Sequence, residues 1–277
     1  MKSTGNFLEQ IMQARRAQVA RRAAAVSPNA LRDKARRARA RARPQALRAA
    51  IKDRARINVI AEIKRASPSQ GTIRSTAVPA EIALSYSAGG AAAISVLTEE
   101  DYFRGSLDDL RAVRAAVDLP VLRKDFIFDE FQIYEAAAAG ADALLLIAAA
   151  LDDEQLARLR RITEEELMMD ALVEVHTNDE LRRALGCGAA LIGVNNRNLQ
   201  TFEVSLDTSI KLIQEAPPGA IFIAESGLST GEHLRRLSAL GYRGFLIGET
   251  LMRAADPGAA LRALLDEADS GAETGTG

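Results

Sequence analysis

Charged and polar residues stand at the C-terminal ends of several short apolar runs in this chain. The runs are VIAEIK at 59–64, PVLRKDF at 120–126, LVEVH at 172–176, LIGVNNRN at 191–198 and IFIAESG at 221–227. The residues in question are Glu62, Lys64, Lys124, Glu174, Asn195 and Glu225. Such runs are typical of strands buried on both faces, where a charge is costly to bury without a purpose. Because Lys and Glu side chains can donate and accept protons, the pattern indicates an enzyme with acid–base groups.

Eight predicted strands alternate with eight predicted helices and would position these residues. The strands are 57–63, 92–97, 119–124, 142–147, 170–175, 190–195, 220–225 and 244–247, and the helices are 79–88, 106–117, 129–139, 152–167, 177–186, 205–215, 230–240 and 257–268. Alternation of this kind predicts a closed, parallel (β/α)8 TIM barrel with its active site at the C-terminal strand ends. A doubly wound open sheet is the alternative, but it would normally carry a glycine fingerprint where this chain has KRASPSQG.

The composition limits the class of protein. The 277 residues are 48% hydrophobic and 26% charged, as in a soluble globular protein. The chain has no apolar stretch long enough for a membrane helix, and its first residues, MKSTGNFLEQIMQARR, lack the apolar block expected of a secretory signal. A single Cys187 excludes an internal disulfide, and two histidines cannot complete the usual zinc sites. We expect a cytoplasmic protein, monomeric or weakly homodimeric, with neither a metal nor a membrane partner.

The N-terminal segment differs from the rest in charge. Residues 1–56 carry 16 Lys and Arg against 3 Asp and Glu, whereas residues 57–277 carry 20 against 34. Apolar residues at helical spacing predict an amphipathic helix over 7–26, with further helices over 30–42 and 44–53. The stripe consists of Phe7, Leu8, Ile11, Met12 and Val19. We expect residues 1–56 to form a helical extension packed on a barrel of residues 57–268, followed by a disordered tail, 269–277.

The basic run at 34–43 allows two hypotheses. It could be the outer face of a helix that lies on the acidic barrel, or it could attract phosphates of a nucleic acid or a membrane surface. The segment has no aromatic residue for base stacking, so a nucleic-acid partner is the less favoured hypothesis.

Lys124 and Glu174 are the strongest acid–base candidates. Strand alternation puts Arg123 and Asp125 on the face opposite Lys124, and neighbouring cations and apolar walls would make this lysine easier to deprotonate. It could then act as a general acid or a Schiff-base nucleophile. Glu174 has apolar neighbours on its strand, so desolvation would favour its neutral form. His176 stands near the rim, with a surface structural role favoured over a catalytic one.

The ends of the last two predicted strands indicate a phosphate site. Backbone N–H groups at Gly227 and Gly248 can approach an anion, and a short helix N-terminus can add its dipole. Glu249 would contribute only its backbone N–H, with its side chain pointing away. Ser67 and Ser69, in the loop after the first strand, could supply further donors.

As a set, these motifs resemble the indole-3-glycerol phosphate synthase family of tryptophan biosynthesis. The segments IAEIKRASPSQG, ISVLTEE followed by FRGSLDDL, LRKDF, QIYEA, LVEVH, IGVNNRNL and ESG carry the resemblance, which covers roughly residues 5–266. It implies a (β/α)8 barrel with an N-terminal helical segment and a carboxy-lyase that needs no metal or organic cofactor. The implied reaction closes the ring of 1-(2-carboxyphenylamino)-1-deoxyribulose 5-phosphate with loss of carbon dioxide and water.

The resemblance also implies roles for individual residues. Lys124 is the general acid, Lys64 binds the substrate carboxylate and could donate a proton during dehydration, and Glu174 and Glu62 are acid–base partners. The remaining roles are substrate orientation by Asn195, Glu225 and Ser226, phosphate binding by Ser67, Gly227 and Gly248, an apolar wall from Phe126, and support of hydroxyls or carboxylates by Arg197.

Three other hypotheses stay open. A phosphoribosylanthranilate isomerase would use a Cys–Asp pair, but Cys187 is expected at the wrong end of the barrel. A Schiff-base aldolase would use Lys124 and would be trapped by borohydride. A catalytically inactive barrel could bind nucleic acid through its basic segment and would form no indole.

Overall fold

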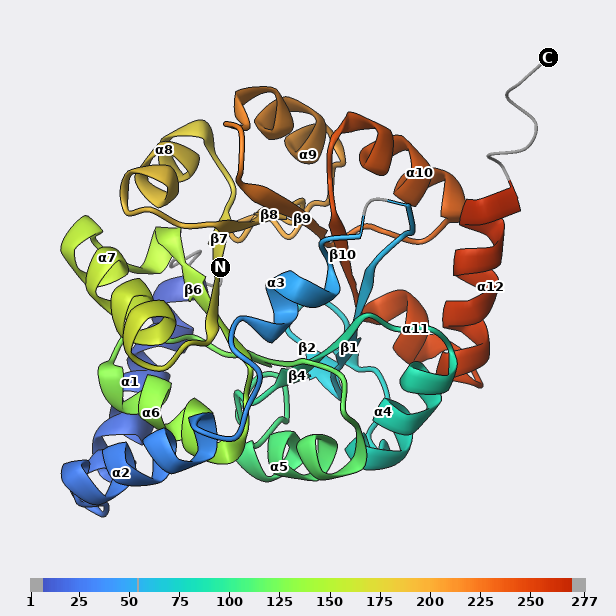
Figure 1. Cartoon of the computed structure of the whole chain (residues 1–277). Helices are drawn as coiled ribbons and strands as arrows, with labels where there is room; N and C mark the ends of the chain where they lie inside the picture. Colours follow the sequence, from blue (N-terminus) through green and yellow to red (C-terminus); the bar gives the residue numbers. More distant parts are fainter. Residues whose placement is uncertain (1–6, 54, 271–277) are drawn as a thin grey trace, which may run out of the picture.

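Eight parallel strands close into a barrel in the computed structural model, which describes residues 7–53 and 55–270 (Figure 1). The barrel strands are β1 (Val59–Ile63), β4 (Ala93–Leu97), β5 (Val121–Lys124), β6 (Ala143–Ile147), β7 (Asp170–Val175), β8 (Leu191–Asn195), β9 (Ile221–Glu225) and β10 (Gly244–Ile247). Each strand pairs with the next one along the chain, and β1 pairs with β10 to close the ring. The predicted (β/α)8 fold is therefore confirmed.

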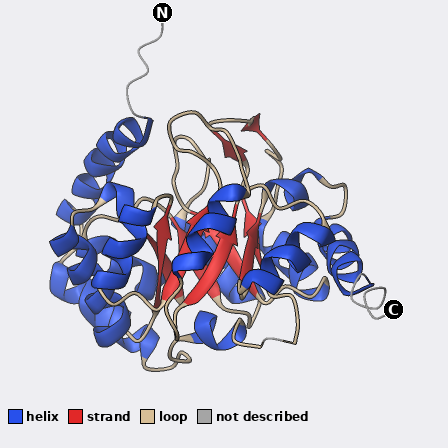
Figure 2. Ribbon diagram, turned by 90° about the horizontal axis from the view of Figure 1, so that it is seen from above, coloured by secondary structure: helices blue, strands red, loops and turns tan. Residues whose placement is uncertain are grey.

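Helices surround the barrel, and each strand is followed by at least one of them (Figures 1 and 2). They are α4 (Pro79–Ala88), α5 (Leu107–Ala116), α6 (Glu130–Ala139), α7 (Asp153–Arg161), α8 (Asn178–Gly186), α9 (Asp207–Leu212), α10 (Gly231–Leu240), α11 (Glu249–Arg253) and α12 (Pro257–Ser270). The predicted helix over 152–167 is α7 followed by a π-helical turn, Ile162–Glu166, and the one over 205–215 is α9 followed by a 3-10 turn, Ile213–Glu215. A short hairpin of β2 (Ala66–Ser67) and β3 (Gly71–Thr72) stands in the loop after β1.

Side-chain caps explain where several of these helices begin. The hydroxyl of Thr177 accepts a hydrogen bond from the backbone N–H of Glu180, and Ser106 does the same for Asp109 at the start of α5. Each cap satisfies one of the N–H groups that have no partner inside the helix. The turn from strand to helix is therefore encoded locally, at the end of the barrel where the strands finish.

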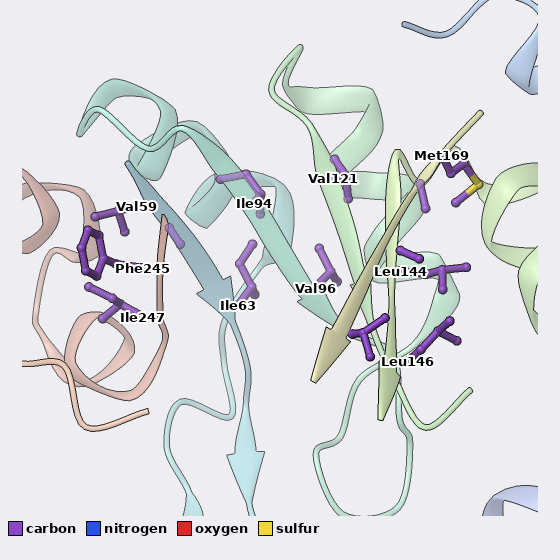
Figure 3. Close-up of a cluster of buried hydrophobic side chains, with 14 of the residues drawn as sticks. Val59, Ile63, Ile94, Val96, Val121, Leu144, Leu146, Met169, Phe245 and Ile247 are labelled. Atoms are coloured by element: carbon purple, nitrogen blue, oxygen red, sulfur yellow. The ribbon is translucent and has the colours of Figure 1, made fainter. Parts of the chain in front are cut away.

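Alternation along the strands divides the core into two layers. Residues that point outward pack under the helices, as Val59, Ile63, Ile94 and Val96 do in Figure 3. The intervening residues fill the barrel, and they are Ile60, Ala93, Leu122, Ala143, Leu145, Ile147, Leu172, Leu191, Ile223 and Leu246. Both faces of the strands are buried, which explains their nearly continuous apolar sequence.

Between residues 7 and 53, three helices precede the barrel. They are α1 (Phe7–Ala24), α2 (Pro28–Arg39) and α3 (Ala46–Ala50), and α2 lies against α6 (Figure 1). The predicted stripe on α1 is buried at Leu8, Ile11, Met12 and Val19. In α3, Leu47 packs with the apolar residues inside the barrel, so this helix closes the N-terminal end.

The two ends of the chain need separate statements. The last helix, α12, continues to Ser270, so the prediction of a disordered tail from residue 269 is wrong for its first two residues. The remainder of that tail, 271–277, lies outside the described residues, as do residues 1–6 and 54. Among the described helices, none combines the length and apolar character that crossing a membrane requires.

Candidate active site

A cavity of about 400 Å³ opens at the C-terminal ends of the barrel strands. All of the site residues predicted from the sequence line it: Glu62, Lys64, Ser67, Lys124, Phe126, Glu174, Asn195, Arg197, Glu225, Ser226, Gly227, Gly248 and Glu249. They come from β1, β5, β7, β8, β9 and β10 and from the loops that follow these strands. The barrel thus brings together residues that are far apart in the sequence, at the end where such folds hold their active sites.

Two lysines and three glutamates form the charged floor of this cavity. The Nζ atom of Lys124 lies 2.8 Å from Oε2 of Glu225 and 3.4 Å from Oε2 of Glu174. On β1, Nζ of Lys64 lies 2.7 Å from Oε1 of Glu62. The charges are almost removed from solvent, so their mutual interactions are much stronger than those of surface pairs.

The environment of Lys124 overturns one expectation. Burial lowers the pKa of this ammonium group, but the carboxylates of Glu225, Glu174 and Glu62 outweigh it and raise the pKa above its usual value. Lys124 is therefore held in its protonated form, and the expectation that it deprotonates easily is wrong. Arg123 and Asp125 do point to the opposite face of β5, where both are buried. A protonated lysine suits a general acid, whereas a Schiff-base nucleophile needs the neutral amine.

The carboxylates also differ from the expectation. Burial raises the pKa of Glu174, but the charges of Lys124 and His176 outweigh burial, and the pKa of Glu174 is lowered. The predicted neutral form of Glu174 is therefore wrong. Burial and the neighbouring charge of Glu174 raise the pKa of Glu225 to about 7, despite its contact with Lys124. The pKa values of the two carboxyl groups therefore differ, and such a difference allows one group to act as an acid and the other as a base.

Two glycines make room for the carboxylates. A Cβ atom on Gly193 of β8 would lie 2.1 Å from Oε1 of Glu225, and one on Gly248 would lie 2.4 Å from Oε1 of Glu62. Both glycines therefore let a buried carboxylate approach the backbone closely. Gly193 was missed in the sequence, although a glycine at an inward position of a strand is a recognisable signal for such an approach.

Asn195 and Ser226 are joined by hydrogen bonds. The Oδ1 atom of Asn195 accepts a hydrogen bond from Oγ of Ser226 at 2.8 Å and one from the backbone N–H of Arg197 at 3.0 Å. Ser226 has φ of 66°, a left-handed conformation that is uncommon outside glycine. Such local strain recurs at binding sites, where the surrounding structure holds it in place.

Polar groups gather on the side of the cavity formed by the loops after β1, β8 and β10. The buried Oγ of Ser67 has no hydrogen-bond partner within the described part of the chain. The side chain of Glu249 contacts Arg197 at 3.5 Å and Arg253 at 3.2 Å, and the expectation that it points away from a bound phosphate stays a prediction. Arg253 also lines the cavity and was not identified from the sequence.

The opposite wall is aromatic and partly comes from α1. The rings of Phe103 and Phe126 lie 6.2 Å apart, and both line the cavity. Phe7, at the start of α1, packs its ring edge-to-face with Tyr102 and with Phe202, each at 5.3 Å. Leu8 and Ile11 of α1 also line the cavity. The stripe predicted on α1 therefore contributes to the site as well as to packing.

A buried ion-pair network ties α1 to the strand that carries Lys124. Nε of Arg15 donates to Oδ1 of Asp125 at 2.9 Å, and both side chains are fully buried. Asp125 also accepts from Arg123, whose Nε donates to Oγ1 of Thr98. Arg15 falls on the apolar stripe of α1, between Met12 and Val19, and this position is the signal that could have revealed its burial.

His176 lies deeper than predicted. Its side chain is 12% exposed, and Nε2 stands 3.6 Å from Oε1 of Glu174. The favoured prediction placed His176 at the surface, and this placement is wrong. In the described residues, no group of three or more His, Cys, Asp and Glu side chains is arranged to hold a metal ion.

The fold and this cavity define a (β/α)8-barrel protein with an acid–base site at the C-terminal strand ends. The family described as indole-3-glycerol phosphate synthase matches residues 8–264. A protein of that name from Carboxydothermus hydrogenoformans is 48% identical over 265 residues, which are 94% of this chain and 99% of that protein. Another, from Albidiferax ferrireducens, is 54% identical over 206 residues, 74% of this chain and 78% of its own length. The chain belongs to the indole-3-glycerol phosphate synthase family.

Solved structures that resemble this one include other barrel enzymes. The 3-hexulose-6-phosphate synthase from Salmonella typhimurium superimposes with a TM-score of 0.62 at 15% identity, covering 77% of this chain and 99% of that structure. Thiamine phosphate pyrophosphorylase from Pyrococcus furiosus gives a TM-score of 0.59 at 17% identity, covering 79% and 98%. At such low identity these likenesses concern the fold alone.

Proposed function

We propose that this chain closes the indole ring of 1-(2-carboxyphenylamino)-1-deoxyribulose 5-phosphate, releasing carbon dioxide and water and forming indole-3-glycerol phosphate. Membership of the family carries the proposal. The cavity supports it, because a protonated lysine, ionisable carboxylates and an aromatic wall line one enclosed space. These features match a substrate that has an aromatic ring, a carbonyl to be protonated and two anionic groups.

Lys124 acts as the general acid in this proposal. The aromatic carbon that bears the carboxylate attacks the ribulose carbonyl, and Lys124 gives its proton to the carbonyl oxygen. Carbon dioxide then leaves and the ring regains its aromaticity. The three carboxylates around Lys124 keep it protonated until the substrate arrives, and a general acid of this kind typically contributes about 10²–10⁴-fold in rate.

The dehydration that follows needs both an acid and a base. Glu174 is the base in this proposal because its lowered pKa keeps it ionised, with Glu62 as its acid–base partner. Lys64 binds the substrate carboxylate and can protonate the departing hydroxyl. Asn195 and Ser226, joined by their hydrogen bond, orient the substrate together with Glu225.

The substrate phosphate binds at the other side of the cavity in this proposal. The unpartnered hydroxyl of Ser67 and the backbone N–H groups of Gly227 and Gly248 are the donors. Arg197 is next to them and supports the substrate hydroxyls, while Glu249 contributes its backbone N–H. Phe126 contacts the aromatic ring of the substrate at the opposite wall.

One measurement tests the function directly. Purified protein is incubated with the ribulose phosphate substrate, and the appearance of indole fluorescence is followed. We expect turnover without added metal, and no reduced adduct when borohydride is added with substrate. Absence of indole formation, or a trapped adduct on Lys124, would overturn the proposal. A cytoplasmic location and a monomeric or weakly dimeric state stay predictions from the sequence.

A further inference from the structure

A histidine that the proposed reaction does not use contacts the charged cluster. His176 follows β7 directly and, two residues beyond Glu174, points to the same side of the strand. Its Nε2 lies 3.6 Å from Oε1 of Glu174 and makes no hydrogen bond within the described residues. Hydrogen bonds of catalytic groups are often long before substrate binds and tighten afterwards. This nitrogen is therefore poised toward Glu174.

Glu180 holds the other side of the imidazole ring. Its Oε2 lies 3.2 Å from Nδ1 of His176 and accepts the backbone N–H of the same residue at 2.8 Å. Glu180 is fixed in the first turn of α8, where Thr177 caps its backbone N–H. Its side chain is 17% exposed, whereas that of Glu174 is 4% exposed. The three side chains therefore form a line from the solvent to the buried cluster.

Carboxylates face the imidazole from three elements. Glu174 is on β7, Glu180 on α8 and Glu225 on β9, and Glu174 is itself paired with Lys124 of β5. Burial lowers the pKa of His176, but the hydrogen bond to Glu180 and the surrounding carboxylate charges outweigh burial and raise the pKa. The ring thus retains its proton to a higher pH than an ordinary histidine does.

The proposed reaction consumes a proton in each turnover. The substrate enters as a carboxylate anion and loses neutral carbon dioxide and water, so the balance is substrate anion plus one proton to product, carbon dioxide and water. The proton that the base removes during dehydration supplies only one of the two that the acids donate. In the proposed reaction the substrate and then the product fill the cavity, so a route through the barrel wall can supply the second proton while product is still bound.

We propose that His176 delivers this proton from solvent to the general acid, an inference that rests on the proposed function. The N–H bond at Nε2 of the imidazolium breaks, and an O–H bond forms at Oε1 of Glu174. A half turn of that carboxyl group brings the proton to the neutral amine of Lys124, which becomes an ammonium group again. Glu174 returns to its carboxylate form. The neutral ring keeps its proton on Nδ1, turns about its Cβ–Cγ bond to bring the bare Nε2 to water, takes up a proton there and turns back. His176 acts through Glu174 and does not touch the reacting atoms.

The test separates the first turnover from later ones in the full-length His176→Ala variant. The lysines are loaded with protons before substrate binds, and Lys124, which lowers the pKa of Glu174 more than His176 does, remains in the variant. We therefore expect the first turnover to keep nearly its wild-type rate. Later turnovers should slow about tenfold in dilute buffer, less than the roughly 10²–10⁴-fold contributed by a general acid itself. Stopped-flow indole fluorescence should therefore show a burst of about one product per enzyme. Concentrated imidazole buffer should restore the steady rate, because imidazole can enter the space left by the ring.

Two further variants complete the experiment. Glu180→Gln keeps an oxygen beside the ring but removes the outer carboxylate. It should give a smaller burst, and in its pH profile the fall of kcat on the alkaline side should begin at a lower pH than in the wild type. His233→Ala is the matched control, since this second histidine lies on α10 outside the cavity lining and should behave like the wild type. The proposal is overturned if His176→Ala slows all turnovers equally without rescue by imidazole, or slows none. A wild-type protein that forms no indole would instead overturn the proposed function.

Discussion

The same alternation of inward and outward residues runs through both ends of the barrel, but the inward residues are apolar toward the N-terminal end and charged at the C-terminal end. On four strands an apolar residue that points into the barrel is followed, two residues later, by a charged residue that points the same way. The pairs are Ile60 and Glu62, Leu122 and Lys124, Leu172 and Glu174, and Ile223 and Glu225. Below this two-residue step the interior is packed with apolar side chains, and above it the interior opens into the cavity. A single step of about 6.6 Å along a strand therefore separates core from site.

The N-terminal end is closed by the helix that precedes the barrel. Leu47 and Ile51 are fully buried against the lowest inward residues, and Arg48 pairs with Asp170 at 3.2 Å and with Glu164 at 2.9 Å. Charges at this end thus pair with one another and with the backbone of α3, whereas those at the other end surround open space. The comparison teaches that stability and chemistry are assigned to opposite ends of one barrel. The predictions that follow are ways to separate them.

The largest effect is expected at Lys124. We expect Lys124→Ala to lower kcat by about 10²–10⁴-fold, because the general acid is lost. The fold should persist with lower stability, because Glu174 and Glu225 lose their shared cation, and breaking a buried ion pair costs about 3–5 kcal/mol. Steady-state indole fluorescence and thermal unfolding measure the two effects. Lys211→Ala, an exposed position on α9, is the control, and a Lys124→Ala variant with full kcat would remove Lys124 from the mechanism.

The opposite result is expected at the closed end. Leu47→Ala should cost about 2–5 kcal/mol in the free energy of unfolding, the range typical of a buried leucine that leaves a cavity. At temperatures where the protein stays folded, kcat should be unchanged, because Leu47 lies away from the charged floor. Denaturant titration and assays at low temperature would check this. Leu240→Ala, on the exposed side of α10, should change neither quantity appreciably, and a large loss of kcat in Leu47→Ala would contradict the division.

Much of this architecture was predictable from local signals. The strands were located to within two residues at each end, because runs buried on both faces are nearly continuous and apolar. Every predicted site residue lines the cavity, since charged residues at strand ends can only be tolerated where the barrel opens. The ion pair of Glu249 with Arg253 is a local contact within α11, whereas its pair with Arg197 could not be predicted because Arg197 lies in the loop after β8.

Proton affinities could not be predicted from neighbours along the chain. Lys124 has Arg123 and Asp125 beside it in the sequence, but its pKa is governed by Glu225 and Glu174, which lie on other strands. Likewise, the neighbours of Glu174 in the sequence are apolar, whereas the cation that keeps it ionised, Lys124, is on another strand. Charge interactions across the barrel depend on closure of the sheet, and no linear pattern records which side chains then meet.

A pH-dependent effect is expected at Glu225. Its pKa in the folded protein is raised to about 7, whereas in the unfolded chain it should be near the ordinary value of about 4.3. The folded state therefore loses stability as the pH rises from the lower value to the higher one. Glu225→Gln should match the wild type in melting temperature near pH 4 and exceed it above pH 7.

The size of that difference can be measured by thermal unfolding at several pH values. Each kcal/mol corresponds to roughly 2–4 °C in a domain of 150–250 residues. Glu232→Gln, an exposed position on α10, is the control and should show no such trend. If Glu225→Gln were less stable than the wild type at pH 8, its contact with Lys124 would outweigh the cost of burying the charge.

The smallest effect is expected where α1 and α2 meet the barrel. The pairs of α2 with the barrel include Arg32 with Glu130 and Arg36 with Glu166, which are partly exposed, while α1 is held by apolar burial and by the buried pair of Arg15 with Asp125. Exposed pairs contribute only about 0.2–1 kcal/mol each and are screened by salt, whereas apolar burial is not weakened. Hydrogen exchange at low and moderate salt should therefore show faster exchange in α2 and little change in α1. Equal responses of the two helices, or no protection of either, would mean that charge does not distinguish the helix at the mouth from the helix beside α6.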